Sequence, residues 1–303
     1  ASEIPETVKL FDMQQEVLAR SLGDGHRVIH GVAGSGKTLI LSYRCLYLSK
    51  VLTKPILVIC YNSVLTQKLK SLTKGHKGDI QIYHFHAWCR KQLEKHQLGI
   101  PEYESNYVEE LEGAIKSGID QGNISTNQYD AVLIDEGHDF KSEWLRLLVK
   151  MVDPVNGSLL LLYDHAQSIY ERARPLGFSM SSVGIQARGR TTVLKLNYRN
   201  TDEIITFAYR FASKFQSEKF SNEIETPIVV PEKVGRHGPS PCVQIFATFE
   251  DEVLFVAKSL AERRNKSQQS WRDMCVLYPS RREGLIASQM LENQAIPIEW
   301  LAT

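Results

Sequence analysis

Cysteine is scarce in this sequence, and its spacing excludes the two structural roles that it most often has. The 303 residues contain five cysteines, which lie far apart and form no C-x-x-C pair. An odd number of scattered cysteines argues against a disulfide framework and against a structural zinc site. We therefore expect the protein to work in a reducing compartment, and the cytoplasm fits best.

A long hydrophobic run and an excess of one charge are also missing. The apolar stretches are of strand length, far below the roughly 20 residues that a membrane helix needs. Residues 1–9 are too polar for a signal peptide. The 36 basic and 35 acidic side chains give a formal net charge of +1, so any binding of nucleic acid must come from local patches. We expect a soluble protein without a membrane segment.

Short β-rich runs alternate with longer amphipathic or polar segments over most of the chain. Such runs stand at residues 27–31, 56–61, 81–84, 131–135 and 159–164. This alternation predicts an α/β fold, in which helices cross over between the strands of a parallel sheet. The run Leu159–Leu162 is apolar at each position, which is typical of a strand buried on both faces.

The chain is long enough for about two domains, and its pattern changes at two places. Residues 87–127 are helical in pattern and acidic, so we expect a small helical subdomain inserted into a first domain of residues 1–190. A second series follows, with strands expected at 192–196, 242–246 and 274–278, and helices at 201–215, 250–264 and 281–293. We interpret residues 191–303 as an incomplete second α/β domain, with a loop rich in proline and glycine at 226–241.

The segment Gly31–Thr38 reads GVAGSGKT and matches the pattern G-x-x-x-x-G-K-[ST] between an apolar strand and a helix. In this pattern the loop turns its backbone amides inward around a phosphate, and the helix N-terminus adds partial positive charge. The amides concerned are those of Gly34, Ser35 and Gly36. Lys37 would neutralise the β- and γ-phosphate oxygens of ATP, and the Thr38 hydroxyl would bind Mg²⁺. The alternative, a glycine-rich turn without a ligand, leaves the match of both flanks unexplained.

Two carboxylates, Asp135 and Glu136, end the apolar run that begins at Ala131. An aspartate in this position can hold Mg²⁺, usually through water, and the adjacent glutamate can orient and deprotonate an attacking water. The alternative is an acidic pair that stabilises a helix N-terminus, but the phosphate-binding pattern in the same chain favours the first interpretation. The pair predicts hydrolysis rather than transfer to a substrate hydroxyl, which a kinase would catalyse.

The order of these motifs resembles that of the UvrD/Rep branch of superfamily 1 DNA helicases. The motors of that family consist of two RecA-like domains that bind ATP between them. The further matching segments are Phe11–Gln15 (Q motif), Cys60–Asn62 (motif Ia), His84–His86 (motif Ib), Asp164–Tyr170 (motif III) and Leu196–Asn200 (motif IV). The resemblance implies a P-loop NTPase fold of the RecA type for the first domain.

The resemblance also assigns roles to residues around ATP. It implies that Gln15 hydrogen-bonds adenine and that Tyr198 stacks on it. It further implies that Gln167 senses the γ-phosphate and that Arg199 reaches the same phosphate across the domain cleft. Plainer interpretations of these residues stay open, namely a helix-surface Gln15, a core Tyr198 and a surface salt bridge at Arg199.

A path for single-stranded DNA is the next implication of the resemblance. Motifs Ia and Ib would place four side chains along it, and aromatic rings in such a path stack on bases. These residues are Tyr61, Asn62, Phe85 and His86. Residues 63–77 contain four lysines and no acid, although such a run by itself is more typical of a solvated helix face.

Some features depart from the family pattern. Motifs V and VI, which would follow, are absent, and His138 stands where the family usually has Gln. We therefore expect either a truncated chain or a naturally short relative, with weak ATP hydrolysis of its own. The leading hypothesis is the ATP-binding motor portion of a UvrD-like helicase that moves 3′ to 5′ on single-stranded DNA, with a possible protein partner or fused domain beyond the chain ends. The alternative is a nucleotide-gated module that binds DNA or a partner with little turnover.

Overall fold

The computed structural model describes residues 6–60, 63–73, 79–103, 105–155, 157–164, 178–219 and 229–300. The chain divides into two compact units, Ala1–Ser240 and Pro241–Thr303, and each unit is described by itself. In the described part of the chain, no helix combines the length and the apolar character needed to cross a membrane.

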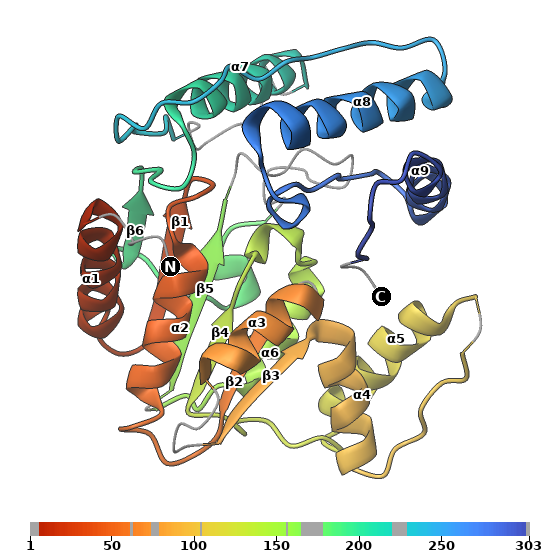
Figure 1. The fold of residues 1–303 in the computed structure, drawn as a ribbon. Helices are drawn as coiled ribbons and strands as arrows, with labels where there is room; N and C mark the ends of the chain where they lie inside the picture. Colours follow the sequence, from red (N-terminus) through yellow and green to blue (C-terminus); the bar gives the residue numbers. More distant parts are fainter. Residues whose placement is uncertain are drawn as a thin grey trace. The chain divides into compact units, whose positions relative to one another are not determined.

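The first unit is built on one parallel sheet (Figure 1). Its strands are β1 (His26–Gly31), β2 (Ile56–Cys60), β3 (Ile80–His84), β4 (Ala131–Ile134), β5 (Ser158–Tyr163) and β6 (Thr191–Leu194). They lie in the order β3-β2-β4-β5-β1-β6, and each neighbouring pair is parallel. The expected α/β fold with a parallel sheet is therefore confirmed.

Helices cover both faces of this sheet. They are α1 (Glu6–Ser21), α2 (Lys37–Leu48), α3 (Ser63–Thr73), α4 (Phe85–Lys95), α5 (Tyr107–Asp120) and α6 (Ser142–Met151). The same unit also contains α7 (Asp202–Lys219) and the short 3₁₀ turns η1 (Gly137–Asp139) and η3 (Ser181–Val183). Successive residues of a strand point to opposite faces. In β4, Ala131 and Leu133 pack with α1, α2 and α3, whereas Val132 and Ile134 pack with α4, α5 and α6. A strand between two cores needs apolar residues on both faces, which is why β4 is apolar throughout and β5 carries the run Leu159–Leu162.

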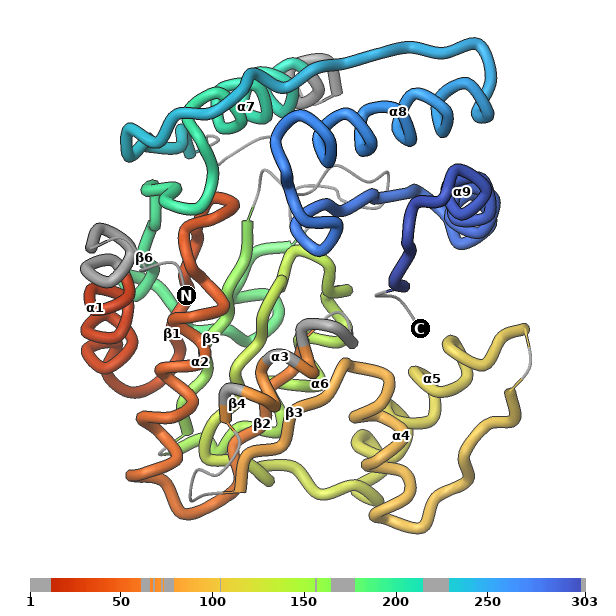
Figure 2. The backbone as a smooth tube through the Cα atoms, viewed as in Figure 1, coloured from red at the N-terminus to blue at the C-terminus, as the bar shows by residue number. Residues whose placement is uncertain are grey.

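The connection from β3 to β4 carries α4 and α5, which pack against each other (Figure 2). The helical insertion that we expected in this part of the chain is therefore present. Its helices share their core with the sheet, because Trp88 of α4 and Leu111 of α5 belong to the same hydrophobic cluster as Leu57 of β2. The insertion extends one layer of the first unit.

The edge strand β6 lies beside β1, with Val28 opposite Thr191 and Gly31 opposite Leu194. We expected this strand to begin a second domain, and in the structure it pairs with the first sheet. The sequence pattern predicts a strand but does not say with which strand it pairs. The domain boundary that we placed at residue 190 stays a prediction.

The second unit contains α8 (Phe249–Ser267), the 3₁₀ turn η4 (Trp271–Asp273) and α9 (Arg281–Asn293). Both helices were expected, and a small core that includes Val253 and Leu291 joins them. The strands expected at 242–246 and 274–278 are wrong, because neither segment belongs to a ladder in the described part of the chain. One apolar side chain in each segment lies almost wholly in solvent, Ile245 at 92% and Leu277 at 90% exposed. An extended segment without a neighbouring strand gains no ladder hydrogen bonds.

Candidate nucleotide-binding site

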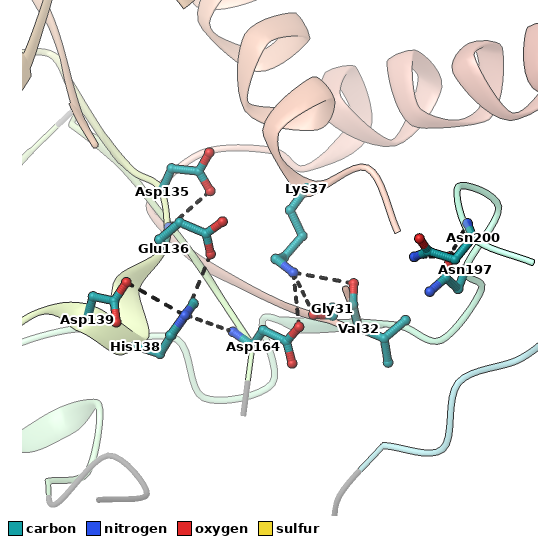
Figure 3. Close-up of polar contacts among 10 residues, drawn as sticks. All are labelled: Gly31, Val32, Lys37, Asp135, Glu136, His138, Asp139, Asp164, Asn197 and Asn200. Carbon is teal, nitrogen blue, oxygen red and sulfur yellow. Dashed lines mark hydrogen bonds and ion pairs between the residues drawn. The ribbon is translucent and has the colours of Figure 1, made fainter. Parts of the chain in front are cut away.

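The sequence motifs meet at the carboxyl edge of the sheet (Figure 3). The phosphate-binding loop follows β1, the carboxylate pair follows β4, Asp164 follows β5, and motif IV follows β6. Because these four strands are neighbours in a parallel sheet, their carboxyl ends bring the segments together. The carboxyl edge of an open α/β sheet is also where ligands of such folds bind.

The phosphate-binding loop depends on two glycines with left-handed backbones, Gly34 at φ 76° and Gly36 at φ 82°. Gly36 is the N-cap of α2, and its carbonyl accepts the hydrogen bond from Ile40 N–H at 3.1 Å. A Cβ on Gly36 would collide with the side chains of Gln15 and Tyr198. The loop is thus tightly enclosed at the N-terminus of a helix, where backbone amides and the helix dipole favour an anion.

The ammonium of Lys37 lies over this loop. Its Nζ donates to the carbonyl oxygens of Gly31 at 2.8 Å and Val32 at 3.3 Å, and it lies 3.5 Å from Asp164 Oδ2. The side chains of Lys37 and Asp164 are 7% and 1% exposed. A buried ammonium held by neutral carbonyls and one carboxylate is well placed to bind phosphate oxygens instead.

Asp135 is fully buried, and its Oδ1 accepts the hydrogen bond from Glu136 N–H at 3.0 Å. Its Oδ2 has no hydrogen-bond partner among the described residues. Burial raises the pKa of Asp135, against the opposing influence of the Thr38 hydroxyl and the Lys37 ammonium. A buried carboxylate oxygen with spare acceptor capacity and a nearby hydroxyl fit Mg²⁺, which takes few protein ligands and keeps several waters. No cluster of three or more His, Cys, Asp or Glu suited to a metal ion occurs within the described ranges.

Glu136 combines an unusual backbone with an unusual acidity. Its φ of 53° and ψ of 44° put it in the left-handed region, which costs about 1 kcal/mol or more for a residue other than glycine. Burial and the neighbouring Asp135 raise the pKa of Glu136 to about 7, with smaller contributions from Asp139 and Asp164 and an opposing one from Lys37. A carboxylate with a pKa near the working pH is suited to accept a proton from water.

His138 and Asp164 connect the ends of β4 and β5. His138 Nδ1 accepts the hydrogen bond from Asp164 N–H at 3.3 Å and lies 3.6 Å from Glu136 Oε2. Sequence reasoning noted His138 only as a departure from the family pattern and did not treat Asp164 as a site residue. The signal was available, because Asp164, like Asp135, follows a largely apolar strand.

Gln15 and Tyr198 lie on the other side of the loop. Gln15 Nε2 donates to Ser35 O at 3.0 Å and to Tyr198 Oη at 2.7 Å, while Gln15 Oε1 is buried without a hydrogen-bond partner in the described part of the chain. These three residues line a cavity of about 350 Å³ together with β6 residues and Glu232. A glutamine and a tyrosine side chain therefore stand side by side on the wall of this cavity.

The remaining residues that we expected around the nucleotide are only partly described. Arg199 is exposed and stands in the same turn as Tyr198. In this turn Asn197 Oδ1 accepts from Asn200 N at 3.1 Å, and a Cβ on Gly34 would meet the Asn197 side chain. Gln167 lies outside the described residues. The roles of Arg199 and Gln167 stay predictions.

Of the residues that we expected along a DNA path, two are described by the structure and two are not. Tyr61 and Asn62 lie outside the described residues. His86 is partly exposed, and its Nε2 lies 3.1 Å from Glu112 Oε1. Phe85 is only 3% exposed and stacks on Trp144 with ring centroids 4.4 Å apart. In this structure Phe85 is therefore a core residue, which is at odds with the expectation that its ring stacks on a base.

A parallel sheet with a phosphate-binding loop after β1 and a carboxylate pair after β4 defines a nucleotide-binding protein of the P-loop NTPase class. Two family models match the chain, that of an AAA domain over residues 14–173 and that of the UvrD-like helicase C-terminal domain over residues 192–302. The chain belongs to the UvrD-like helicase family.

Solved structures resemble the chain only distantly. The helicase domain of Hef from Pyrococcus furiosus is 12% identical with a TM-score of 0.33, and the match covers 93% of this chain and 53% of that one. AMPPCP-bound DnaA from Aquifex aeolicus is 12% identical with a TM-score of 0.30, over 96% of this chain and 90% of that one. This chain thus spans about half the length of the Hef structure, and no curated protein matches it.

Proposed function

We propose that this chain is the ATP-binding motor portion of a DNA helicase, which hydrolyses ATP and couples the hydrolysis to 3′-to-5′ movement on single-stranded DNA. One observation carries the proposal: Lys37 of the phosphate-binding loop, the buried Asp135 and the partly exposed Glu136 converge at one edge of the sheet. Membership of the UvrD-like helicase family supports the reading of this site as a motor. The scarcity of cysteine supports a cytoplasmic location.

Each side chain of the site has a role in this proposal. Lys37 exchanges its loop carbonyls for phosphate oxygens of ATP, and Glu136 orients the attacking water and accepts its proton. Thr38 and Asp135 hold Mg²⁺, which neutralises phosphate charge when it is bound. Gln167 and Arg199 act on the γ-phosphate as the family resemblance implies. Such positioned charges are the main source of catalysis in phosphoryl transfer to water.

The adenine base fits the cavity beside Gln15 and Tyr198. Adenine presents an amino donor that an amide oxygen can accept, while the Nε2 hydrogens of Gln15 already bind Ser35 O and Tyr198 Oη. Gln15 supplies the buried oxygen that lacks a partner among the described residues. Tyr198 supplies an aromatic ring on the wall of the same cavity.

Single-stranded DNA is the proposed track. Tyr61, Asn62 and His86 are the proposed contacts, and Phe85 is left out because it is buried. Local contacts must supply the attraction to the phosphate backbone, because the formal net charge is only +1.

The test is ATP hydrolysis by the parent chain and by Glu136→Gln, with and without single-stranded DNA. We expect Glu136→Gln to reduce the rate by about a hundredfold or more, which is the usual contribution of a general base. Glu143→Gln is the control, since Glu143 is exposed on α6. If Glu136→Gln and the control hydrolyse ATP equally, and DNA changes neither rate, the motor proposal fails and a nucleotide-gated binding module is the better account.

Direction is tested on DNA that carries biotin and streptavidin at one end. Movement from 3′ to 5′ displaces streptavidin from the 5′ end and leaves the 3′ end loaded. The opposite result contradicts the proposed polarity without affecting the proposed ATPase.

A further inference from the structure

The segment of residues 229–240, which comes after α7 in the chain, runs along motif IV. Glu232 N–H donates to Lys195 O at 2.8 Å, and Asn197 N–H donates to Glu232 O at 3.0 Å, which makes a parallel bridge between Leu196 and Glu232. Sequence reasoning treated this proline- and glycine-rich stretch as a simple loop. Its hydrogen bonds place it against the turn that carries Tyr198 and Arg199.

Arg236 makes the most specific contacts of this segment. One guanidinium nitrogen, Nη1, donates to the carbonyl oxygens of Tyr198 and Arg199, both at 3.0 Å. The backbone of Arg236 is fixed as well, because its carbonyl accepts from Asp202 N–H at 2.8 Å at the start of α7. The guanidinium therefore binds two successive peptide groups of motif IV, and the backbone of Arg236 is held by a hydrogen bond to α7.

The two residues after Arg236 bind the start of α7. Gly238 N–H donates to Glu203 Oε2 at 3.0 Å, and His237 Nδ1 lies 3.2 Å from Glu203 Oε1. Glu203 belongs to the first turn of α7. The segment is thus tied to the helix on one side of motif IV and to the backbone of motif IV itself.

The turn that Arg236 holds touches the phosphate-binding loop at two points. The Asn197 side chain packs on Gly34, and Tyr198 Oη accepts the hydrogen bond from Gln15, which also binds Ser35 O. A shift of the Tyr198 backbone would therefore move the tyrosine hydroxyl and release the amide of Gln15. The orientation of that amide decides whether its oxygen is available to the base.

We propose that Arg236 is a positioning residue, which fixes the Tyr198–Arg199 turn so that Gln15 selects adenine. The proposal rests on the proposed ATP-binding function. Arg236 itself does not line the cavity proposed for the base. It acts through the two carbonyls, and its loss should therefore weaken the preference for adenine over guanine, whose corresponding edge carries a carbonyl acceptor in place of the amino donor.

The experiment measures the binding of fluorescent, non-hydrolysable ATP and GTP analogues with Mg²⁺ to the full chain, so that it does not depend on turnover. We expect Arg236→Ala to lower the ratio of ATP to GTP affinity by about tenfold, the effect of losing one to two hydrogen bonds from a charged donor at an exposed site. Arg236→Lys keeps the charge and an N–H donor group but not the planar guanidinium, and it should restore part of the ratio. Lys233→Ala is the matched control, because Lys233 is exposed on the same segment.

The ratio separates positioning from general destabilisation. If Arg236→Ala weakens both analogues equally, or neither, the proposal is overturned, whatever the melting temperature of the variant. The proposal would also be contradicted if Arg236→Lys lost the preference for ATP over GTP while Arg236→Ala kept the affinity ratio of the parent. Lys37→Ala serves as the separate check on the proposed function. If Lys37→Ala binds both analogues as tightly as the parent, the proposed nucleotide site is wrong. If Lys37→Ala weakens binding but Arg236→Ala leaves the ratio of ATP to GTP affinity unchanged, only the positioning role of Arg236 is refuted.

Discussion

Replacing Gly36 by alanine tests how closely the phosphate-binding loop is enclosed. The backbone of Gly36 has φ 82°, and an L-residue pays about 1–2 kcal/mol in this region. The new Cβ would also collide with Gln15 and Tyr198 and separate Gln15 from its two acceptors, which costs about 1 kcal/mol for each hydrogen bond. We expect Gly36→Ala to lower the free energy of unfolding by about 3 kcal/mol in urea titrations.

Gly122→Ala is the matched control. Gly122 has a similar φ of 76°, but a Cβ there would meet nothing within 4 Å, so this variant pays the backbone strain alone. In nucleotide titrations, Gly36→Ala should lose about 30-fold in affinity for an ATP analogue, which corresponds to about 2 kcal/mol of lost contacts. Gly122→Ala should bind like the parent. Equal unfolding free energies and equal affinities for the two variants would refute the view that Gln15 and Tyr198 close over the loop.

Three other perturbations follow from the described contacts. Because the pKa of Glu136 is raised to about 7, kcat/KM for ATP should rise with pH as the carboxyl ionises and level off above about pH 8; a flat profile between pH 6 and 8 would contradict its role as base. Arg44 is 1% exposed and donates to Ala19 O at 3.3 Å, so Arg44→Ala should lower the unfolding free energy by about 3 kcal/mol without affecting nucleotide affinity. Phe85→Ala should cost about 3–4 kcal/mol of stability in the same urea assay, as for other buried aromatics, and a loss of DNA affinity at unchanged stability would restore the DNA-path interpretation.

The nucleotide site could be predicted from the sequence because its signals are local. A phosphate-binding loop needs glycines at fixed offsets before a helix, and Gly34 and Gly36 stand where left-handed backbones are required. The acidic pair Asp135 and Glu136 follows a strand that is apolar throughout. Parallel strands then bring these segments together, since their carboxyl ends share one edge of the sheet. Neither the raised pKa of Glu136 nor the part played by Asp164 is local, because both depend on which strands are neighbours.

The expectations that differ from the structure all depended on partners distant in the sequence. The run at 191–194 has a strand pattern, but this pattern does not say which strand it pairs with. It joins the first sheet because β1 offers an edge with which it can pair. The segments at 242–246 and 274–278 have similar patterns and lack ladder partners in the described part of the chain, so the same local signal gives no strand there.

The burial of Phe85 also depends on residues that are distant in the sequence. Phe85 lies where β3 gives way to α4, next to the partly exposed His86, and nothing in the local sequence says which of the two rings turns inward. Trp144 of α6 meets both rings: it stacks on Phe85 with ring centroids 4.4 Å apart and meets His86 edge-on at 5.0 Å. Burial of the larger hydrocarbon surface favours Phe85 over the imidazole, and His86 is left at the surface with Glu112. A motif can therefore mark the edge of a binding path while one of its residues serves the core.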